Sequence, residues 1–197
     1  MKKGIILVAM MAACAVAVSA QPRAIGGRLG AFEGVSYEHG FGDNNMLEVE
    51  LGWGFGSRVN GGSRANGTNW WLWGHNIQAA VTYDWIDPFG ATFPWDHKGE
   101  WHWYMGVGGA GGYGWSGYSR AEVGGIYIGD WYRRNWGFLG AAGRIGVEYD
   151  FWFPLQLSID WRPTLGLGLV DRDANGQTYA GFYWEVTSLS LGVRYKF

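Results

Sequence analysis

The chain has 197 residues, enough for one domain, and its 15 basic and 17 acidic residues give a formal net charge of −2. It has no basic stripe and no nucleic-acid-binding motif, so we expect no nucleic-acid partner. Five prolines are too few for a disordered Gly/Pro-rich segment, although glycine contributes 35 residues and Trp, Tyr and Phe contribute 14, 11 and 10.

Residues 1–20 have the features of a secretory signal peptide. Lys2 and Lys3 precede an apolar stretch over residues 4–18, and a small-residue cleavage site follows. We therefore expect export of the chain and a mature domain over residues 21–197.

The single cysteine, Cys14, lies within this apolar stretch and permits no intrachain disulfide. We interpret it as part of the signal peptide. The alternative is a lipoprotein cleavage site, but cleavage there would leave an unusual apolar start to the mature chain.

Beyond residue 20, polar and apolar residues alternate with the period of two that predicts β-strands. We expect eight strands, in chain order near residues 24–31, 35–41, 46–53, 77–85, 100–115, 139–150, 155–167 and 187–197. The third has the clearest alternation, with Leu47, Val49 and Leu51 on one face and Glu48 and Glu50 on the other.

The connections are predicted to alternate between short and long. Short ones follow Phe41 and Asp150, a longer turn covers residues 87–99, a bend near residue 32 closes the first hairpin, and long loops cover residues 57–74, 116–135 and 171–180. An even number of strands, most about 9–11 residues long, predicts an antiparallel up-and-down transmembrane β-barrel.

The two faces of these strands differ in charge, which predicts their orientation. An eight-stranded barrel has an interior just wide enough for side chains, so we expect charges and glycines inside and the apolar faces outside. The predicted interior charges are Arg28, Glu38, Glu48, Glu50, Arg144, Glu148, Asp160, Arg162 and Arg194. Because buried charges are costly unless paired, we expect them to form a network that plugs the barrel. A narrow ion path and a soluble barrel with an apolar interior are the alternatives.

In the last predicted strand, apolar residues alternate with small or polar ones over residues 189–193, and the strand ends in Arg194-Tyr195-Lys196-Phe197. With the signal peptide and the repeated alternation, residues 21–197 resemble the small eight-stranded outer-membrane barrels, of the type of outer-membrane protein X and the barrel domain of outer-membrane protein A. The resemblance implies an all-β protein in the cell outer membrane, in contact with lipid and lipopolysaccharide. It also implies insertion by the barrel assembly machinery, with Tyr195 and Phe197 as the assembly signal, but no shared activity.

Some membrane barrels are enzymes that modify lipid A with a histidine, a serine and a carboxylate. The candidates here are His39, His75, His97 and His102. His39 is predicted to face outward and His97 to lie in a turn, and neither has a serine and an acid at an obvious spacing. His102 is predicted to face inward beside Tyr104. We therefore predict no enzymatic activity and keep lipid A modification as the less favoured alternative. The sequence shows no metal-ligand cluster, and we predict neither a metal site nor a cofactor.

The predicted loop over residues 116–135 carries Arg120, Arg133 and Arg134 among several aromatic residues. We consider it a candidate surface site for lipopolysaccharide phosphates or a host partner. The alternative is a solvated loop with aromatic anchors. We expect the protein to be a monomer.

Overall fold

A computed structural model describes residues 23–30, 33–60, 69–88, 98–123, 125–171 and 178–197. The predicted signal peptide and His97 lie outside the described residues. Among those that are described, no helix has the length and apolar character needed to cross a bilayer.

The described residues form ten strands. They are β1 Arg23–Gly30, β2 Glu33–Phe41, β3 Asn45–Asn60, β4 Asn69–Pro88, β5 Gly99–Val123, β6 Ile126–Phe151, β7 Leu155–Trp161, β8 Thr164–Val170, β9 Tyr179–Glu185 and β10 Leu189–Lys196. β7 and β8 are two parts of one barrel strand, and so are β9 and β10, which leaves eight strands in the wall.

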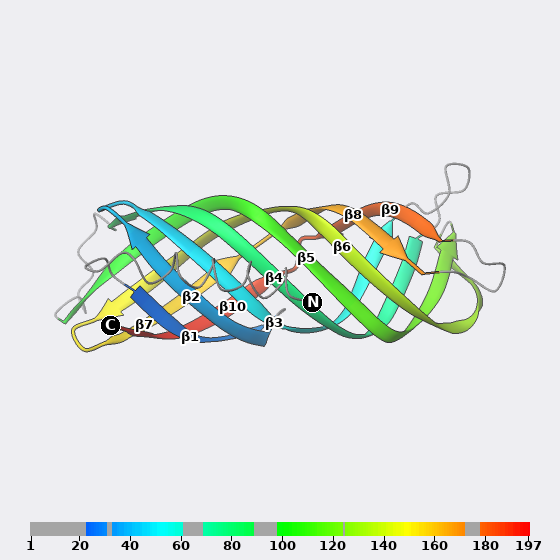
Figure 1. Cartoon of the computed structure of the whole chain (residues 1–197), viewed down its shortest axis with the longest axis horizontal. Helices are drawn as coiled ribbons and strands as arrows, with labels where there is room; N and C mark the ends of the chain where they lie inside the picture. The colour runs from blue at the N-terminus through cyan, green and yellow to red at the C-terminus, as the bar shows by residue number, and fades with distance from the viewer. Residues whose placement is uncertain (1–22, 31–32, 61–68, 89–97, 124, 172–177) are drawn as a thin grey trace, which may run out of the picture.

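Antiparallel pairing between neighbours closes the sheet on itself. Each strand pairs with the next along the chain, and β10 pairs with both β7 and β1 to complete the ring. The prediction of an all-β, eight-stranded antiparallel up-and-down barrel is thus confirmed. Figure 1 shows an elongated barrel whose strands wind obliquely around its axis.

Pro163 marks the interruption between β7 and β8, because proline has no backbone N–H to donate. The register with β6 continues across it, since Gly143 N donates to Pro163 O at 2.9 Å. On the other side, Trp161 lies opposite Leu189 and Thr164 lies opposite Glu185. Two residues of β7–β8 therefore face three of β9–β10, and this extra residue is a β-bulge that shifts the alternation by one.

The number of strands in the wall decreases along the barrel axis. β1 and β2 have 8 and 9 residues, whereas β5 and β6 have 25 and 26. Beyond the short β1–β2 hairpin, β9 pairs directly with β3, with Val59 opposite Tyr183. The ring there consists of β3, β4, β5, β6, β8 and β9.

The described residues of two predicted loops are mostly in strands. β3 extends to Asn60 and β4 begins at Asn69, within the loop predicted over residues 57–74. β5 and β6 continue to a turn at Gly125, whose φ of 82° lies in the left-handed region that favours glycine. The loop prediction was wrong because Gly, Asn and Ser suggested turns, whereas pairing with long neighbouring strands keeps these segments extended.

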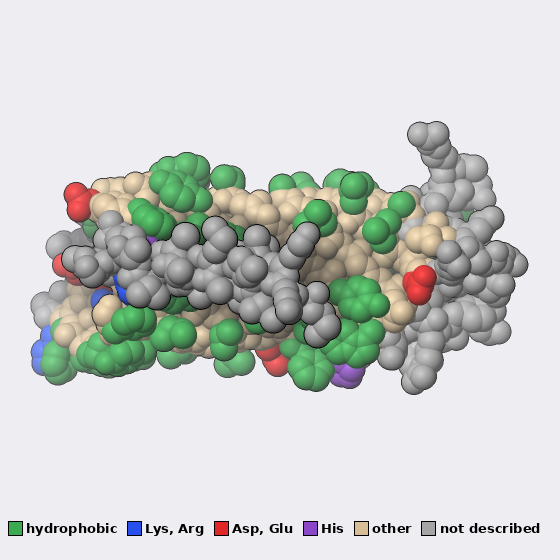
Figure 2. Space-filling view, in the orientation of Figure 1, with side chains coloured by type: hydrophobic (Ala, Val, Ile, Leu, Met, Phe, Trp, Pro, Cys, Tyr) green, Lys and Arg blue, Asp and Glu red, His purple; other side chains and the backbone are tan. Residues whose placement is uncertain are grey.

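Apolar side chains face outward along the wall, as Figure 2 shows for its visible face. Leu139, for example, is 74% exposed. By contrast, all nine charged residues predicted inside are buried. The barrel therefore has the reverse of the usual soluble arrangement, with charge in its centre and apolar residues on its surface.

Candidate functional site

The barrel interior has three regions along its axis. A cavity, here called the mouth cavity, lies at the end formed by the β2–β3 and β6–β7 turns. The charge network follows, made of the predicted interior charges and Asp84. Farther along lies an aromatic layer, which consists of Trp136, Phe138 and Tyr183.

Glu48 on β3 is the centre of the charge network. Arg28 of β1 donates to Glu48 Oε1 at 3.0 Å, and Arg194 of β10 donates to the same oxygen at 2.6 Å. Arg144 of β6 forms a further ion pair with Glu48 Oε2. One carboxylate thus joins guanidinium groups from three strands around the lumen.

Asp160 on β7 is a second junction. It accepts hydrogen bonds from Arg28, from Tyr104 Oη at 2.9 Å and from Arg144 at 3.3 Å. Arg144 also donates to Asp84 at 2.8 Å. The contacts of Arg28 and Arg144 with both Glu48 and Asp160 cross the barrel from wall to wall.

Arg162 and a second contact of Arg194 extend the network. Arg162 pairs with Glu50, and Arg194 lies 3.0 Å from Glu38. Glu148 differs from the other predicted members, because no hydrogen bond or ion pair joins it to another described residue.

Carboxylates outnumber guanidinium groups in this interior. The buried acids among the described residues are Glu38, Glu48, Glu50, Asp84, Glu148 and Asp160, and the buried bases are Arg28, Arg144, Arg162 and Arg194. When all are ionised, the interior carries two negative charges in excess, so the network is not neutral by itself.

Inward-facing glycines make room for the large side chains of the network. A Cβ atom on Gly146 would lie 2.6 Å from the Tyr104 hydroxyl, and one on Gly106 would overlap Asp84. Close approach of neighbouring groups to these glycines explains their abundance inside the wall.

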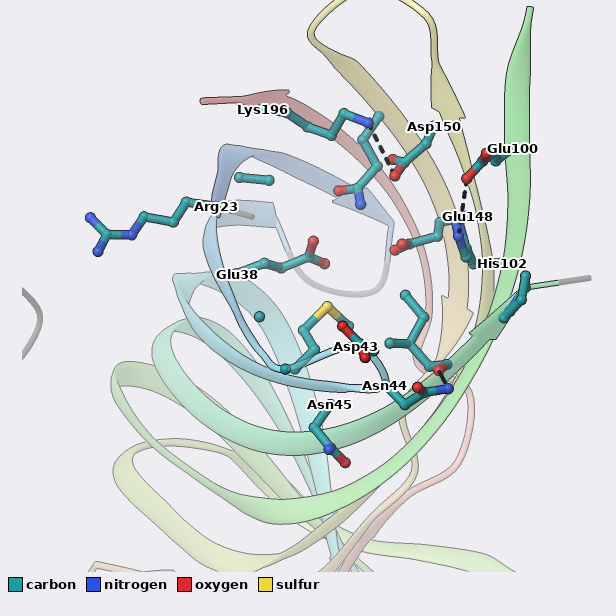
Figure 3. Close-up of a pocket in the computed structure, with 17 residues that line it drawn as sticks. Arg23, Glu38, Asp43, Asn44, Asn45, Glu100, His102, Glu148, Asp150 and Lys196 are labelled. Atoms are coloured by element: carbon teal, nitrogen blue, oxygen red, sulfur yellow. Dashed lines mark hydrogen bonds and ion pairs between the residues drawn. The ribbon is translucent and has the colours of Figure 1, made fainter. Parts of the chain in front are cut away.

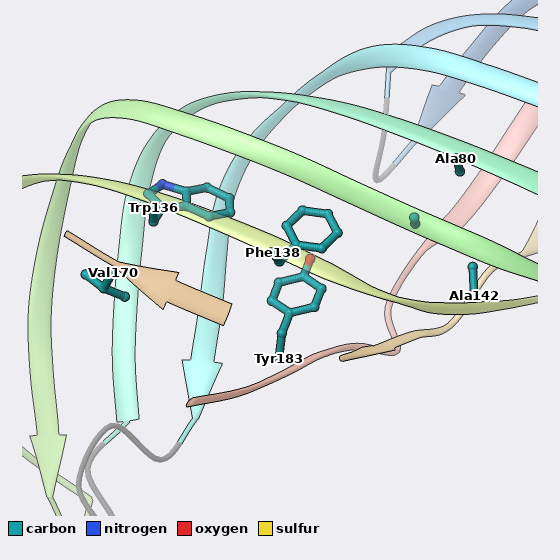
Figure 4. Packing of buried hydrophobic residues seen from close by; sticks show 7 residues of the cluster. Ala80, Trp136, Phe138, Ala142, Val170 and Tyr183 are labelled. Carbon is teal, nitrogen blue, oxygen red and sulfur yellow. The ribbon is translucent and has the colours of Figure 1, made fainter. Parts of the chain in front are cut away.

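The aromatic layer was not predicted, because Trp136 lies between the loop predicted over residues 116–135 and the strand predicted over residues 139–150. Trp136 is only 2% exposed and stacks with Phe138 at 6.4 Å between ring centroids. Phe138 of β6 stacks on Tyr183 of β9 at 4.0 Å (Figure 4). Gly112 and Gly114 on β5 lie beneath these rings, where Cβ atoms would collide with Phe138 and Trp136.

The mouth cavity has a volume of about 450 Å³. Figure 3 shows Glu38, His102, Glu148 and Asp150 around it. Lys196 Nζ lies 3.1 Å from Asp150 Oδ2.

Three of these residues form a group of metal-ligand type that the sequence did not reveal, whereas the prediction of no metal site stays a prediction. One ligand atom each from His102, Glu148 and Asp150 lies within 4.8 Å of the others. Sequence reasoning missed the cluster because His102 and Glu148 are far apart along the chain. Their cross-strand pairing brings them together.

Of the other candidate histidines, neither of the two that the structure describes, His39 and His75, lines this cavity. His75 is on the exposed outer face of β4, where Trp53 Nε1 donates to its Nδ1 at 3.2 Å. His39 was predicted to face outward, and it shares a strand face with Tyr37 and Phe41. It is nevertheless buried, and its ring contacts both neighbours.

The predicted assembly signal lies on the outer face of β10. Tyr195 and Phe197 are exposed, and their rings stack at 6.5 Å. Their role in assembly stays a prediction.

The predicted surface site of Arg120, Arg133 and Arg134 lies on strands, although a loop was expected. The backbone of Arg120 belongs to β5, and the backbones of Arg133 and Arg134 belong to β6, so they lie on paired strands instead of a loop. Their side chains lie outside the described part of the chain.

Comparison with known proteins adds little to this geometry. No known protein family matches the chain, and no curated protein matches it. Among solved structures, it is similar to a major outer membrane protein from Thermus thermophilus, with 13% sequence identity and a TM-score of 0.48, over 90% of this chain and 100% of that one. Similarity at this level carries no argument about function, which we therefore base on the residues themselves.

Proposed function

We propose that the chain is an integral outer-membrane β-barrel with a blocked interior, which stabilises the envelope or presents its strand extensions outside the cell. The main support for this proposal is that the apolar faces of the strands point outward and the charged faces point inward. Large apolar side chains project from the wall while ten charged ones are buried within it. In water this arrangement would expose apolar surface and bury charge, both of which are costly, whereas a bilayer favours the outward apolar face.

Contacts across the lumen support a blocked interior. Side chains of β1, β6 and β10 meet Glu48 of β3, and Phe138 stacks on Tyr183 in the aromatic layer. An eight-stranded barrel leaves room for little more than its own side chains. Two successive layers of contacts therefore oppose the passage of a hydrated ion.

Cell fractionation combined with gel electrophoresis tests the membrane assignment. We expect the protein in the outer-membrane fraction, and we expect the folded barrel to migrate differently before and after heating in detergent. Recovery in the soluble fraction, with no heat-dependent change in migration, would contradict the proposal.

An arginine at the centre of the outer face is expected to be destabilising only if that face meets lipid. Leu191 lies near the middle of the barrel strand formed by β9 and β10, between the exposed Leu29 and Ile159. We expect Leu191→Arg to lower the free energy of unfolding in lipid vesicles by about 2–4 kcal/mol, measured by urea titration.

Leu191→Val is the matched control, because it keeps the site apolar, and its effect should be much smaller. A Leu191→Arg barrel as stable as the unchanged protein would argue for an outer face that meets water.

Planar-bilayer recordings separate the blocked barrel from a narrow channel. We expect no single-channel steps above background from the purified, folded protein. Steady steps that scale with protein concentration would favour the channel instead.

We further propose that the protein is a monomer without enzymatic activity, in contact with lipopolysaccharide and inserted by the barrel assembly machinery. Mass spectra of lipid A from cells with and without the gene test the enzymatic alternative, which predicts a mass difference between the two.

A further inference from the structure

The mouth cavity brings together three side chains of metal-ligand type. His102 of β5 lies directly opposite Glu148 of β6, and Asp150 follows two residues later on the same face of β6. One ligand atom from each lies within 4.8 Å of the others. Two neighbouring strands therefore hold an imidazole and two carboxylates at one point of the cavity wall (Figure 3).

Glu148 is buried in this cluster without a partner among the described residues. It is only 2% exposed, and its Oε2 has no hydrogen bond to any of them. His102 Nδ1 and Asp150 Oδ1 are also buried and lack hydrogen bonds within the described part of the chain. Arg144 and Arg194 act on Glu148 electrostatically but form no hydrogen bond or ion pair with it. A buried carboxylate without a bonded partner is costly. Each residue of the cluster thus has a buried ligand-type atom without a hydrogen bond, which indicates a cationic ligand.

The charges around the cavity also favour a cation. The charged residues that line it, besides His102, are Arg23, Glu38, Asp43, Glu100, Glu148, Asp150 and Lys196. Arg23 extends away from the other labelled side chains in Figure 3. Lys196 contacts only Oδ2 of Asp150, which leaves Oδ1 available. Glu100 Oε2 lies 3.8 Å from His102 Nε2 and adds negative charge.

We propose that His102, Glu148 and Asp150 bind one divalent transition-metal ion of the Zn²⁺ class. Imidazole ligands suit Zn²⁺ and its neighbours, whereas Ca²⁺ and Mg²⁺ prefer oxygen ligands throughout. Metal–ligand bonds of about 2.0–2.2 Å place two ligand atoms of one ion at most about 4.4 Å apart. Small side-chain rotations would therefore complete the site, and the cavity has room for a water ligand.

Isothermal titration of the folded, tag-free protein with Zn²⁺ tests the proposal. We expect saturable binding of one ion per chain and a higher urea midpoint of unfolding with Zn²⁺ than without it, because the ion binds only the folded site. Ca²⁺ at the same concentration should give neither effect.

Glu148→Gln and His102→Gln should each weaken Zn²⁺ binding at least tenfold and abolish the shift in midpoint. His75→Gln is the matched control, since His75 lies on the outer face and should leave both unchanged. The heat-dependent gel shift checks that each variant folds. If folded Glu148→Gln and His102→Gln bind Zn²⁺ as the control does, or if the unchanged protein shows no saturable binding, the proposal is overturned.

Discussion

Replacing Glu48 by alanine is expected to lower the free energy of unfolding by about 3–5 kcal/mol, because removal of one partner leaves buried charges uncompensated. Glu48 contacts Arg28, Arg144 and Arg194, which come from three strands. Urea unfolding of the barrel in lipid vesicles, followed by the gel shift of the folded form, measures the loss.

Glu33→Ala is the control for this substitution, because Glu33 is an exposed acid on the neighbouring strand β2. Its effect should stay within about 0.5 kcal/mol. Equal effects of the two substitutions would show that the charge network does not hold the wall together.

Replacing Trp136 by alanine is expected to cost about 3–5 kcal/mol, since it removes the largest side chain of the aromatic layer and leaves a cavity beside Phe138. Trp136→Phe should cost less, because the smaller ring still fills part of the space over Gly114. The same urea titration compares the two.

Leu139→Ala provides the contrast on the same strand, because Leu139 points outward. In the proposed bilayer setting, lipid would fill the space left by the smaller side chain. We expect a clearly smaller loss than for Trp136→Ala. A larger loss from Leu139→Ala would mean that packing inside the barrel contributes less than packing against lipid.

Alternation along the strands was enough to predict most of the barrel. In β3, the carboxylates of Glu48 and Glu50 interrupt an apolar series at every second residue, and such a strand needs a polar and an apolar side. Charge then determined which side faces the centre. The same reasoning placed Asp160 on β7 and Arg194 on β10 inside.

Irregularities of the wall limited the prediction elsewhere. In a regular strand, buried residues are either all odd-numbered or all even-numbered. Tyr183 and Ser188 are both buried, because the bulge between β9 and β10 shifts the alternation by one residue. Trp136 could have been recognised as an interior residue, because it is even-numbered like Phe138 and Arg144, which face the interior from β6. Its position among Gly, Asn and Arg residues suggested a loop instead.

Predicting the cluster at the mouth cavity would have required the register between β5 and β6. His102 and Glu148 are each unremarkable along the chain, and only the pairing of β5 with β6 makes them neighbours. Alternation predicts which face a residue occupies, but the offset between two long strands depends on contacts made over their whole length.

The seam between β1 and β10 has a consequence for how the barrel forms. Ala24 lies opposite Lys196 there, so the ring closes only when segments from the two ends of the domain meet. Contacts between such distant segments form slowly, and until then both edges have unpaired backbone groups that can join other chains. These two edges are therefore the parts of the barrel that can pair with other chains until the ring has closed.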